Sequence, residues 1–183
     1  MPDSALEQLP LRPVSPPRAV VPLKGFQAFD AVFRHGARFA YRGVTAFVLF
    51  DDVLAKAQKS SPDDHALQHI SANYQQHSSV ITGNDTLSHA LLVGVSAKRR
   101  TRPAVMRNRI KRLLRTSIHQ TIQREGQLSR GIAAMVLICN IIPEKPSLLV
   151  LDEIAPLVGR IVQNADKYYS SRHGNSNAAK EKL

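Results

Sequence analysis

Apolar side chains recur at helical spacing in three parts of the chain, and each recurrence predicts a helix with one buried face. The first helix is expected from Lys24 to His35, where Gly36 provides a natural stop. A longer helix is expected at 104–124, and a last one at 152–169. The stripe of the long helix consists of Met106, Ile110, Leu113, Leu114, Ile118 and Ile122.

Apolar runs of strand length separate these helices. Residues 38–50 are expected to form strands that break at Arg42-Gly43, and further buried strands are expected at 90–97 and 132–139. Because a helix joins the last two strands, they are expected to run parallel. The order of elements predicts an α+β fold in which helices pack on one small sheet.

Three polar segments interrupt or flank this pattern. Residues 1–22 hold six prolines and are expected to form a disordered, extended tail. Residues 51–89 are rich in Ser, Gln, His and Asn and carry an acidic surplus, which predicts a loop insertion. A helical turn is expected at 53–58, and the rest is expected to be a long, mobile loop. Residues 170–183 are expected to be a second disordered tail. The expected organisation is thus one domain at 23–169, interrupted by the insertion.

The composition adds a strong charge imbalance to this picture. In 183 residues, 25 Lys and Arg stand against 14 Asp and Glu, a formal net charge of +11. Such a surplus indicates a polyanionic partner. The single cysteine, Cys139, excludes a disulfide framework and a multi-cysteine zinc site. With no apolar run long enough for a membrane span and no signal-peptide pattern, we expect a cytoplasmic protein.

The basic residues concentrate between Lys98 and Arg124, a stretch with no Asp or Glu. A solvated helix normally carries acids for ion pairing, so their absence favours a bound polyanion over an ordinary exposed face. Arg107, Lys111 and Arg115 are spaced to form one stripe, and Asn108 adds a side chain that can also accept hydrogen bonds.

Other chemistry is weakly represented. Phe26, Phe29 and Phe33 share helical spacing, which by itself favours a core position over a base-stacking surface. Cys139 lies in an apolar strand and is interpreted as a core thiol rather than a nucleophile. No catalytic motif is present, and we expect neither catalytic side chains nor a metal site; the insertion's histidines have only a weak metal-binding pattern. These histidines are His65, His69 and His77.

The run from Val93 to Arg100, followed by the helix that begins at Ala104, resembles the bacterial ribonuclease P protein component. The family signature is an Arg-Asn-Arg helix after a "VG-S-KK" strand; here Arg107-Asn108-Arg109 follows VGVSAKRR. Upstream, residues 23–36 and then Arg42 before a strand match the family's N-terminal block. The resemblance covers about residues 23–50 and 90–165.

The resemblance implies a fold and an activity. The fold would be the α-β-β-β-α-β-α arrangement of ribosomal protein S5 domain 2, with a left-handed β-α-β crossover, against the usual preference. The activity would be that of an endoribonuclease that removes the 5′ leader of precursor tRNA. Its partners would be ribonuclease P RNA and precursor tRNA, with no DNA or membrane expected. Mg²⁺ would be held mainly by the RNA subunit, which would perform the chemistry.

The resemblance also assigns residues to two RNA-contacting regions. The cleft that receives the leader would be lined by Phe29, Phe33 and Phe47, with Arg42 nearby; Phe26 has no counterpart and stays a core prediction. The basic set that contacts RNA would be Lys98, Arg99, Arg100, Arg107, Asn108, Arg109, Lys111, Arg112 and Arg115.

The sequence departs from the family at Arg102-Pro103, at Cys139-Asn140 and in the long insertion. Three alternatives to a ribonuclease P subunit stay open. A ribosomal-type RNA-binding protein would need the basic helix but no aromatic groove. A DNA-binding regulator would need a helix-turn-helix, for which no preceding short helix is visible. A membrane-surface helix would need the apolar stripe that the sheet already requires.

Overall fold

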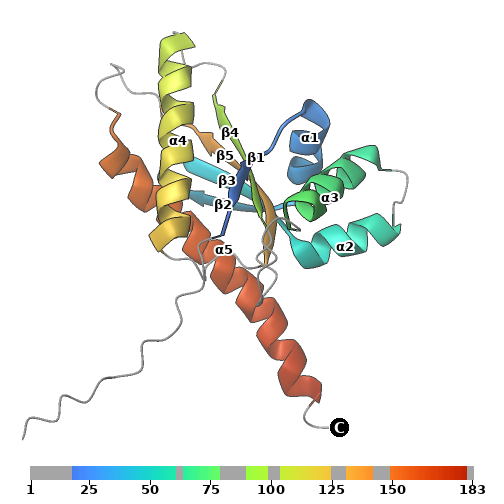
Figure 1. Cartoon of the computed structure of the whole chain (residues 1–183). Helices are drawn as coiled ribbons and strands as arrows, with labels where there is room; N and C mark the ends of the chain where they lie inside the picture. The colour runs from blue at the N-terminus through green and yellow to red at the C-terminus, as the bar shows by residue number, and fades with distance from the viewer. Residues whose placement is uncertain are drawn as a thin grey trace, which may run out of the picture.

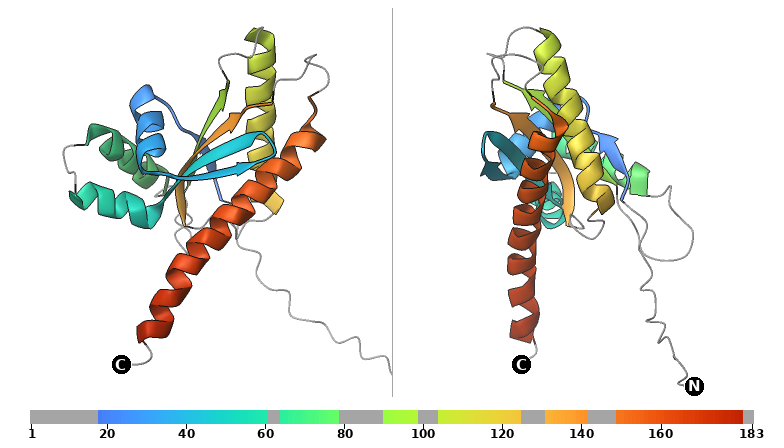
Figure 2. Two further views of the ribbon diagram at one scale, coloured as in Figure 1. Left: turned by 180° about the vertical axis from the view of Figure 1, so that it is seen from behind. Right: turned by 90° about the vertical axis from the view of Figure 1, so that its left-hand side faces the viewer.

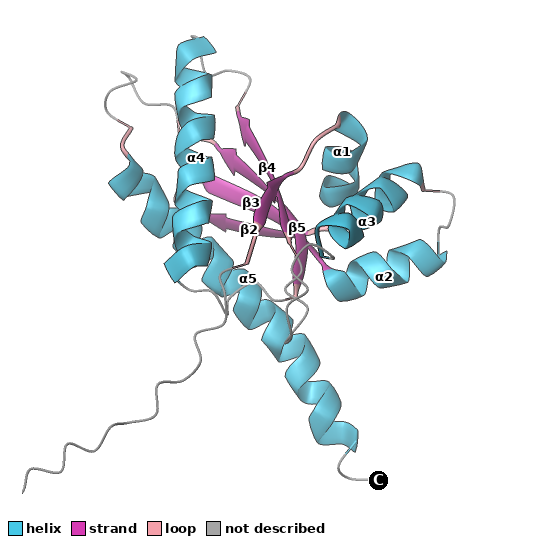
Figure 3. Cartoon of the chain, viewed as in Figure 1, coloured by secondary structure: helices cyan, strands magenta, loops and turns pink. Residues whose placement is uncertain are grey.

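The computed structural model describes residues 18–60, 64–78, 90–98, 104–124, 131–141 and 149–180, with the side chains of 76–78 and 174–180 left aside. A single sheet forms the centre of the molecule, and helices lie on both of its faces (Figures 1 and 3). The α+β class predicted from the sequence is confirmed.

The sheet has five strands in the order β1-β4-β5-β3-β2. The strands are β1 (Val20–Pro22), β2 (Ala37–Tyr41), β3 (Val44–Phe50), β4 (Leu91–Ala97) and β5 (Ile132–Cys139). β2, β3 and β5 pair antiparallel, whereas β4 pairs parallel with both β5 and β1. The predicted parallel pair is therefore confirmed, and the handedness of its crossover stays a prediction.

The β2–β3 hairpin turns through two residues, Arg42 and Gly43, which both have positive φ angles, 41° and 82°. Two-residue hairpin turns of this kind match the right-handed twist of the strands. The break that the sequence predicted at Arg42-Gly43 is this turn.

One face of the sheet is covered by α4 (Ala104–Arg124) and α5 (Leu151–Lys180). The apolar stripe of α4 supplies Ile110, Leu114 and Ile118, each at most 1% exposed, to a core shared with β3, β4 and β5. This packing explains why α4 begins and ends where the pattern predicted: the stripe runs through it from its first turn to its last.

The opposite face is covered by α1 (Phe26–His35), α2 (Asp51–Ser60) and α3 (His65–Ser78) (Figure 1). The helical turn expected at 53–58 is confirmed within α2, whereas the loop expected over the rest of the insertion is wrong at 65–78, where α3 forms. Asp64 directly precedes α3, and its carboxylate accepts hydrogen bonds from the backbone N–H groups of Ala66 and Leu67. Its buried side is apolar and has helical spacing; it consists of Ala66, Leu67, Ile70 and Tyr74. Polar residues between these positions concealed the stripe.

The N-terminal prediction was also wrong at its inner end. β1 adds a strand to the sheet, and Pro22 is tolerated there because β1 is an edge strand. Arg18 is buried, and its guanidinium donates a hydrogen bond to the carbonyl of Ala90 over 3.1 Å. Burial lowers the pKa of Arg18, while Tyr74 and Asp51 act to raise it. Residues 1–17 lie outside the described part.

The last helix is longer than predicted. α5 continues to Lys180 instead of ending near Tyr169, so a separate disordered tail from residue 170 is wrong for 170–180. Figure 2 shows this extension running past the sheet. This part of α5 contacts α2 of the insertion. The Tyr169 hydroxyl donates a hydrogen bond to Asp51 over 3.0 Å, and the Arg172 guanidinium lies 3.8 Å from the Asp52 carboxylate.

Candidate RNA-binding surface

The outer side of α4 presents a basic surface. Asn108, Arg112 and Arg115 are exposed and lie on the side opposite the apolar stripe, with His119 one turn further on. Between Lys98 and Arg124 there is no acid, and neither Arg112 nor Arg115 forms an ion pair with any residue that the structure describes. We call Asn108, Arg112 and Arg115 the α4 basic face.

The other predicted bases on α4 have different surroundings. Arg107 and Lys111 are half-buried at the flank, so the stripe of Arg107, Lys111 and Arg115 is less uniformly exposed than its spacing predicted. Arg109 is exposed, but its Nε donates a hydrogen bond to the carbonyl of Leu149 over 3.1 Å. Arg109 therefore joins α4 to the segment that leads into α5, a structural role that the sequence did not predict.

The remaining basic candidates lie where β4 ends. Lys98 is exposed directly after the strand. Arg99 and Arg100 lie outside the described residues, so their predicted contact with RNA stays a prediction.

Three aromatic rings meet on the other face of the sheet. Phe33 of α1 lies 4.9 Å from Phe47 of β3 and 6.4 Å from Phe29, measured between ring centroids, and both pairs are edge-to-face. Phe33 is 38% exposed, whereas Phe29 and Phe47 are half-buried. We call these residues the aromatic cluster. The exposed part of the Phe33 ring offers aromatic surface to a base.

Two residues that sequence reasoning missed shape this cluster. Gly94 of β4 leaves room for Phe29, because a Cβ at this position would lie 2.6 Å from the tip of the ring. Arg38 pairs directly with Phe47 across the β2–β3 ladder, so their side chains share one face of the sheet. Arg38 is exposed, and it places a cation beside the rings. The pairing of residues 38 and 47 around the two-residue turn was the available signal.

Arg42 is not brought to the rings in this way. It occupies the hairpin turn, five residues before Phe47 in the chain. Its guanidinium lies 5.5 Å from the ring centre of Tyr41. It is exposed at the end of the hairpin. Its predicted place in a leader-binding cleft stays a prediction.

Phe26 was predicted to be a core residue, and this prediction is wrong. Its side chain is 85% exposed at the start of α1. The small residues Ala28 and Ala31, together with Val32, form the buried side of the helix instead. Helical spacing placed the three phenylalanines of α1 on one side but could not tell which side packs against the sheet.

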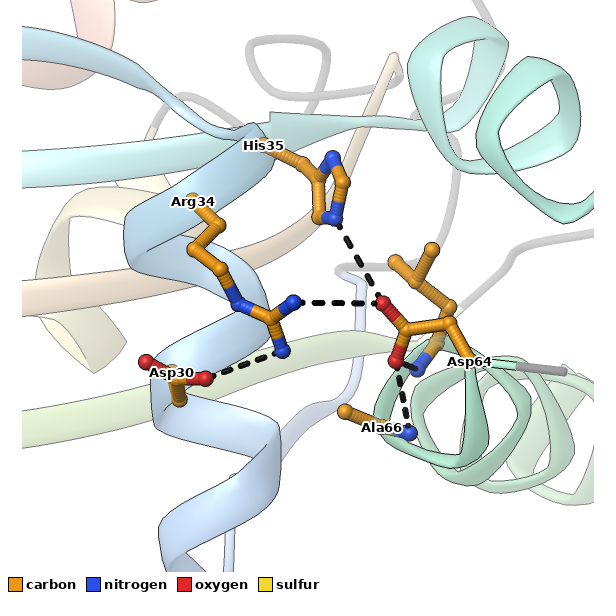
Figure 4. A network of polar contacts seen from close by, with 6 residues as sticks. Asp30, Arg34, His35, Asp64 and Ala66 are labelled. Carbon is orange, nitrogen blue, oxygen red and sulfur yellow. Dashed lines mark hydrogen bonds and ion pairs between the residues drawn. The ribbon is translucent and has the colours of Figure 1, made fainter. Parts of the chain in front are cut away.

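Asp64 ties the insertion to α1 (Figure 4). Its carboxylate lies 3.5 Å from the Arg34 guanidinium and 3.7 Å from His35 Nε2, and Arg34 also pairs with Asp30 over 2.9 Å. Burial acts to raise the pKa of Asp64, but the backbone N–H groups of Leu67 and Ala66, with Arg34 and His35, lower it overall. The ionised carboxylate therefore holds the start of α3 against the end of α1.

The structure also describes the surroundings of Cys139, the possible metal ligands and the apolarity of the helices. Cys139 is buried, and burial raises the pKa of its thiol, which confirms the core interpretation. Among the described residues, no three His, Cys, Asp or Glu side chains come together as a group that could hold a metal ion. Within the same residues, no helix is both long and apolar enough to cross a membrane.

A basic helix without acids and a part-exposed aromatic cluster therefore lie on opposite faces of one sheet. The family model for ribonuclease P matches residues 19–161, which include both features. The chain belongs to the ribonuclease P family. The match begins at the residue before β1 and extends into α5, so it includes the α2–α3 insertion.

Solved structures that align with this chain include ribonuclease P protein from Staphylococcus aureus. One aligns with 11% identity and a TM-score of 0.45, covering 79% of this chain and 94% of that one. A mutant of the S. aureus protein with defective mRNA degradation activity aligns with 10% identity and a TM-score of 0.45, covering 79% and 86%. No curated protein matches the sequence significantly.

Proposed function

We propose that this ribonuclease P family protein is the subunit that binds the catalytic RNA and the 5′ leader of precursor tRNA. The observation that carries the proposal is the combination of the α4 basic face with the aromatic cluster. A phosphate backbone needs cations without internal partners, and single-stranded bases need exposed aromatic rings. This chain offers each of them on a separate face of the sheet.

In this proposal, the α4 basic face binds the catalytic RNA and the aromatic cluster binds the leader. Arg112 and Arg115 contact phosphates of the catalytic RNA, and Asn108 accepts or donates a hydrogen bond there. Phe33 stacks on a leader base, while Arg38 contributes a positive charge beside it. The RNA subunit would hold the Mg²⁺ ions and would supply the metal-dependent chemistry, while the protein supplies binding and orientation. No protein side chain takes part in bond cleavage.

The alternative is a ribosomal-type RNA-binding protein with no processing role. Such a protein would use the α4 basic face in the same way. It would have no use for a part-exposed ring that is supported by two further rings and a glycine. The aromatic cluster, together with the family membership, therefore favours the ribonuclease P subunit.

The decisive experiment is reconstitution. The protein is mixed with a bacterial ribonuclease P RNA at low Mg²⁺, and cleavage of a labelled precursor tRNA is followed. We expect leader removal that needs both components and leaves a 5′-phosphate on the tRNA. If the protein binds structured RNAs tightly but does not stimulate cleavage, the ribosomal-type alternative holds.

A further inference from the structure

A hollow of about 350 Å³ lies between the β1–α1 connection and α3. Its polar lining consists of Lys24 from the connection and His69 and Asn73 from the insertion helix. Its remaining lining is Val21, Pro22, Leu23 and Leu92. It has a positive side chain, a polar pair and an apolar wall, with no acid among its lining residues. This combination suits a nucleotide, which has a phosphate, a polar base edge and an apolar base face.

The polar pair is already oriented by its own hydrogen bonds. The Asn73 amide nitrogen donates to His69 Nδ1 and to the His69 carbonyl, each over 3.0 Å. Because Nδ1 accepts, the neutral imidazole carries its proton on Nε2 and offers a donor there. The amide oxygen of Asn73 is an acceptor. A donor and an acceptor thus lie four residues apart on one helix, and every nucleobase offers the complementary groups on its pairing edge.

An exposed aromatic ring follows the hollow's Lys24 closely in the chain. Phe26 begins α1 two residues after Lys24 and is 85% exposed. Phe26 and Phe33 are seven residues apart, two turns of helix, so they project from the same side of α1 with about 10 Å between them along the axis. A strand of RNA that stacks on Phe33 can therefore continue along α1 to Phe26.

We propose that the hollow and Phe26 form a second subsite for a single-stranded nucleotide of the precursor leader. The subsite rests on the proposed function, because the leader is the single strand that this function brings to α1. The ring of Phe26 stacks on the base, Lys24 neutralises a phosphate, and His69 and Asn73 bond to the base edge. The insertion thereby contributes directly to RNA binding. Since all four bases offer the required groups, this subsite has little sequence preference.

The first test uses the isolated protein and a labelled leader oligonucleotide. We expect Phe26→Ala and Asn73→Ala each to weaken binding several-fold without changing its salt dependence, because neither side chain is charged. Lys24→Ala should weaken binding and reduce the slope of log K against log salt by about 0.7, the value for one phosphate of a single strand. Matched controls are Gln75→Ala on the exposed side of α3 and Val105→Ala on α4, both expected to bind as the wild type does.

The second test uses the reconstituted holoenzyme and precursors that differ only in leader length. Phe26→Ala and Asn73→Ala should lower kcat/KM for long leaders and leave it unchanged for leaders too short to extend past Phe33. A photoreactive phenylalanine at position 26 should cross-link to the leader of a long precursor. Far-ultraviolet circular dichroism and the Tm of each variant should match the wild type, because the substituted side chains are on the surface.

The outcomes separate the two proposals. If wild-type holoenzyme removes leaders but the variants bind and cleave as it does, the subsite is wrong and the proposed function holds. If position 26 cross-links only to the catalytic RNA, the leader assignment is overturned. If no leader is removed under any condition, the proposed function fails and the leader assignment fails with it.

Discussion

The arginines on the two faces of the sheet differ in whether they have acidic partners. On α4, Arg112 and Arg115 are exposed without an ionic partner among the described residues. On the layer that contains the insertion, Arg34 pairs with both Asp30 and Asp64. At the end of α5, Arg172 lies 3.8 Å from Asp52 of the same insertion.

An exposed basic residue therefore indicates an RNA-binding surface only where no internal carboxylate pairs with it. Arginines with internal carboxylate partners join α1 to the start of α3 and α5 to α2, whereas those without partners are available to phosphate. On the insertion side, the candidate RNA contacts are therefore mainly aromatic and amide groups, and Arg38 and Lys24 supply the cations. The protein has a net charge of +11, but only its distribution distinguishes the two layers.

The largest effect should come from the inner side of α4. Ile110 is 1% exposed in the core, so Ile110→Ala should lower the free energy of unfolding by about 2–5 kcal/mol through lost burial and a cavity. Urea unfolding would measure this loss. Asn108→Ala, on the exposed side of the same helix, is the control and should change stability by less than about 0.5 kcal/mol. Equal losses in the two variants would contradict the division of α4 into a core side and a binding side.

The next effect tests whether the aromatic cluster is a binding surface. Phe33→Ala should weaken binding of precursor tRNA relative to mature tRNA by about 1–3 kcal/mol, the contribution of one stacked base. Equilibrium binding of both RNAs to the holoenzyme would show it. Tyr168→Ala is a control, because Tyr168 is a similarly exposed ring that packs on Phe39 and Phe50 instead. A large fall in Tm with unaltered discrimination would place Phe33 in the core.

A smaller effect compares arginines from the two layers. Arg112→Ala with Arg115→Ala should reduce the slope of log K against log salt for the catalytic RNA by about two units, one for each lost phosphate contact. Arg34→Ala should leave that slope unchanged, because its charge is already paired with Asp30 and Asp64. Binding titrations over a range of salt would decide. An unchanged slope in the double variant would show that α4 is not the RNA surface.

The smallest effect concerns the join between α1 and α3. Asp64→Ala removes the N-terminal cap of α3 and should cost about 1 kcal/mol of stability at neutral pH. Because the folded-state pKa of Asp64 is lowered, this contribution is present above the ordinary carboxyl pKa of 3.8 and is lost as the pH falls below it. Unfolding of both proteins at neutral pH and near pH 3 would test this. A stability difference as large at the lower pH as at neutral pH would contradict an ionised Asp64 as its source.

Local patterns were sufficient for the elements whose burial repeats regularly along the chain. The bounds of α4 and β5 agree with the prediction because a long apolar stripe and a continuous apolar run are each readable without knowledge of their partners. The second helix of the insertion, α3, was missed because a few apolar residues, such as Leu67 and Ile70, lie among polar ones. Arg18 was missed because a basic residue after a proline-rich segment gives no local sign that it will be buried.

The α+β class, the acid-free basic helix and the ribonuclease P resemblance could all be predicted without a structure, because they depend on residue types and spacings along the chain. Only the tertiary structure decided which side chains face outward and which meet. In the folded protein Arg18 is buried and Phe26 is exposed. Gly94 leaves room for the Phe29 ring, and Arg38 pairs with Phe47 across the hairpin. The physical reason is that these contacts join segments whose approach depends on strand register and sheet order, and neither is encoded in the periodicity of a single segment.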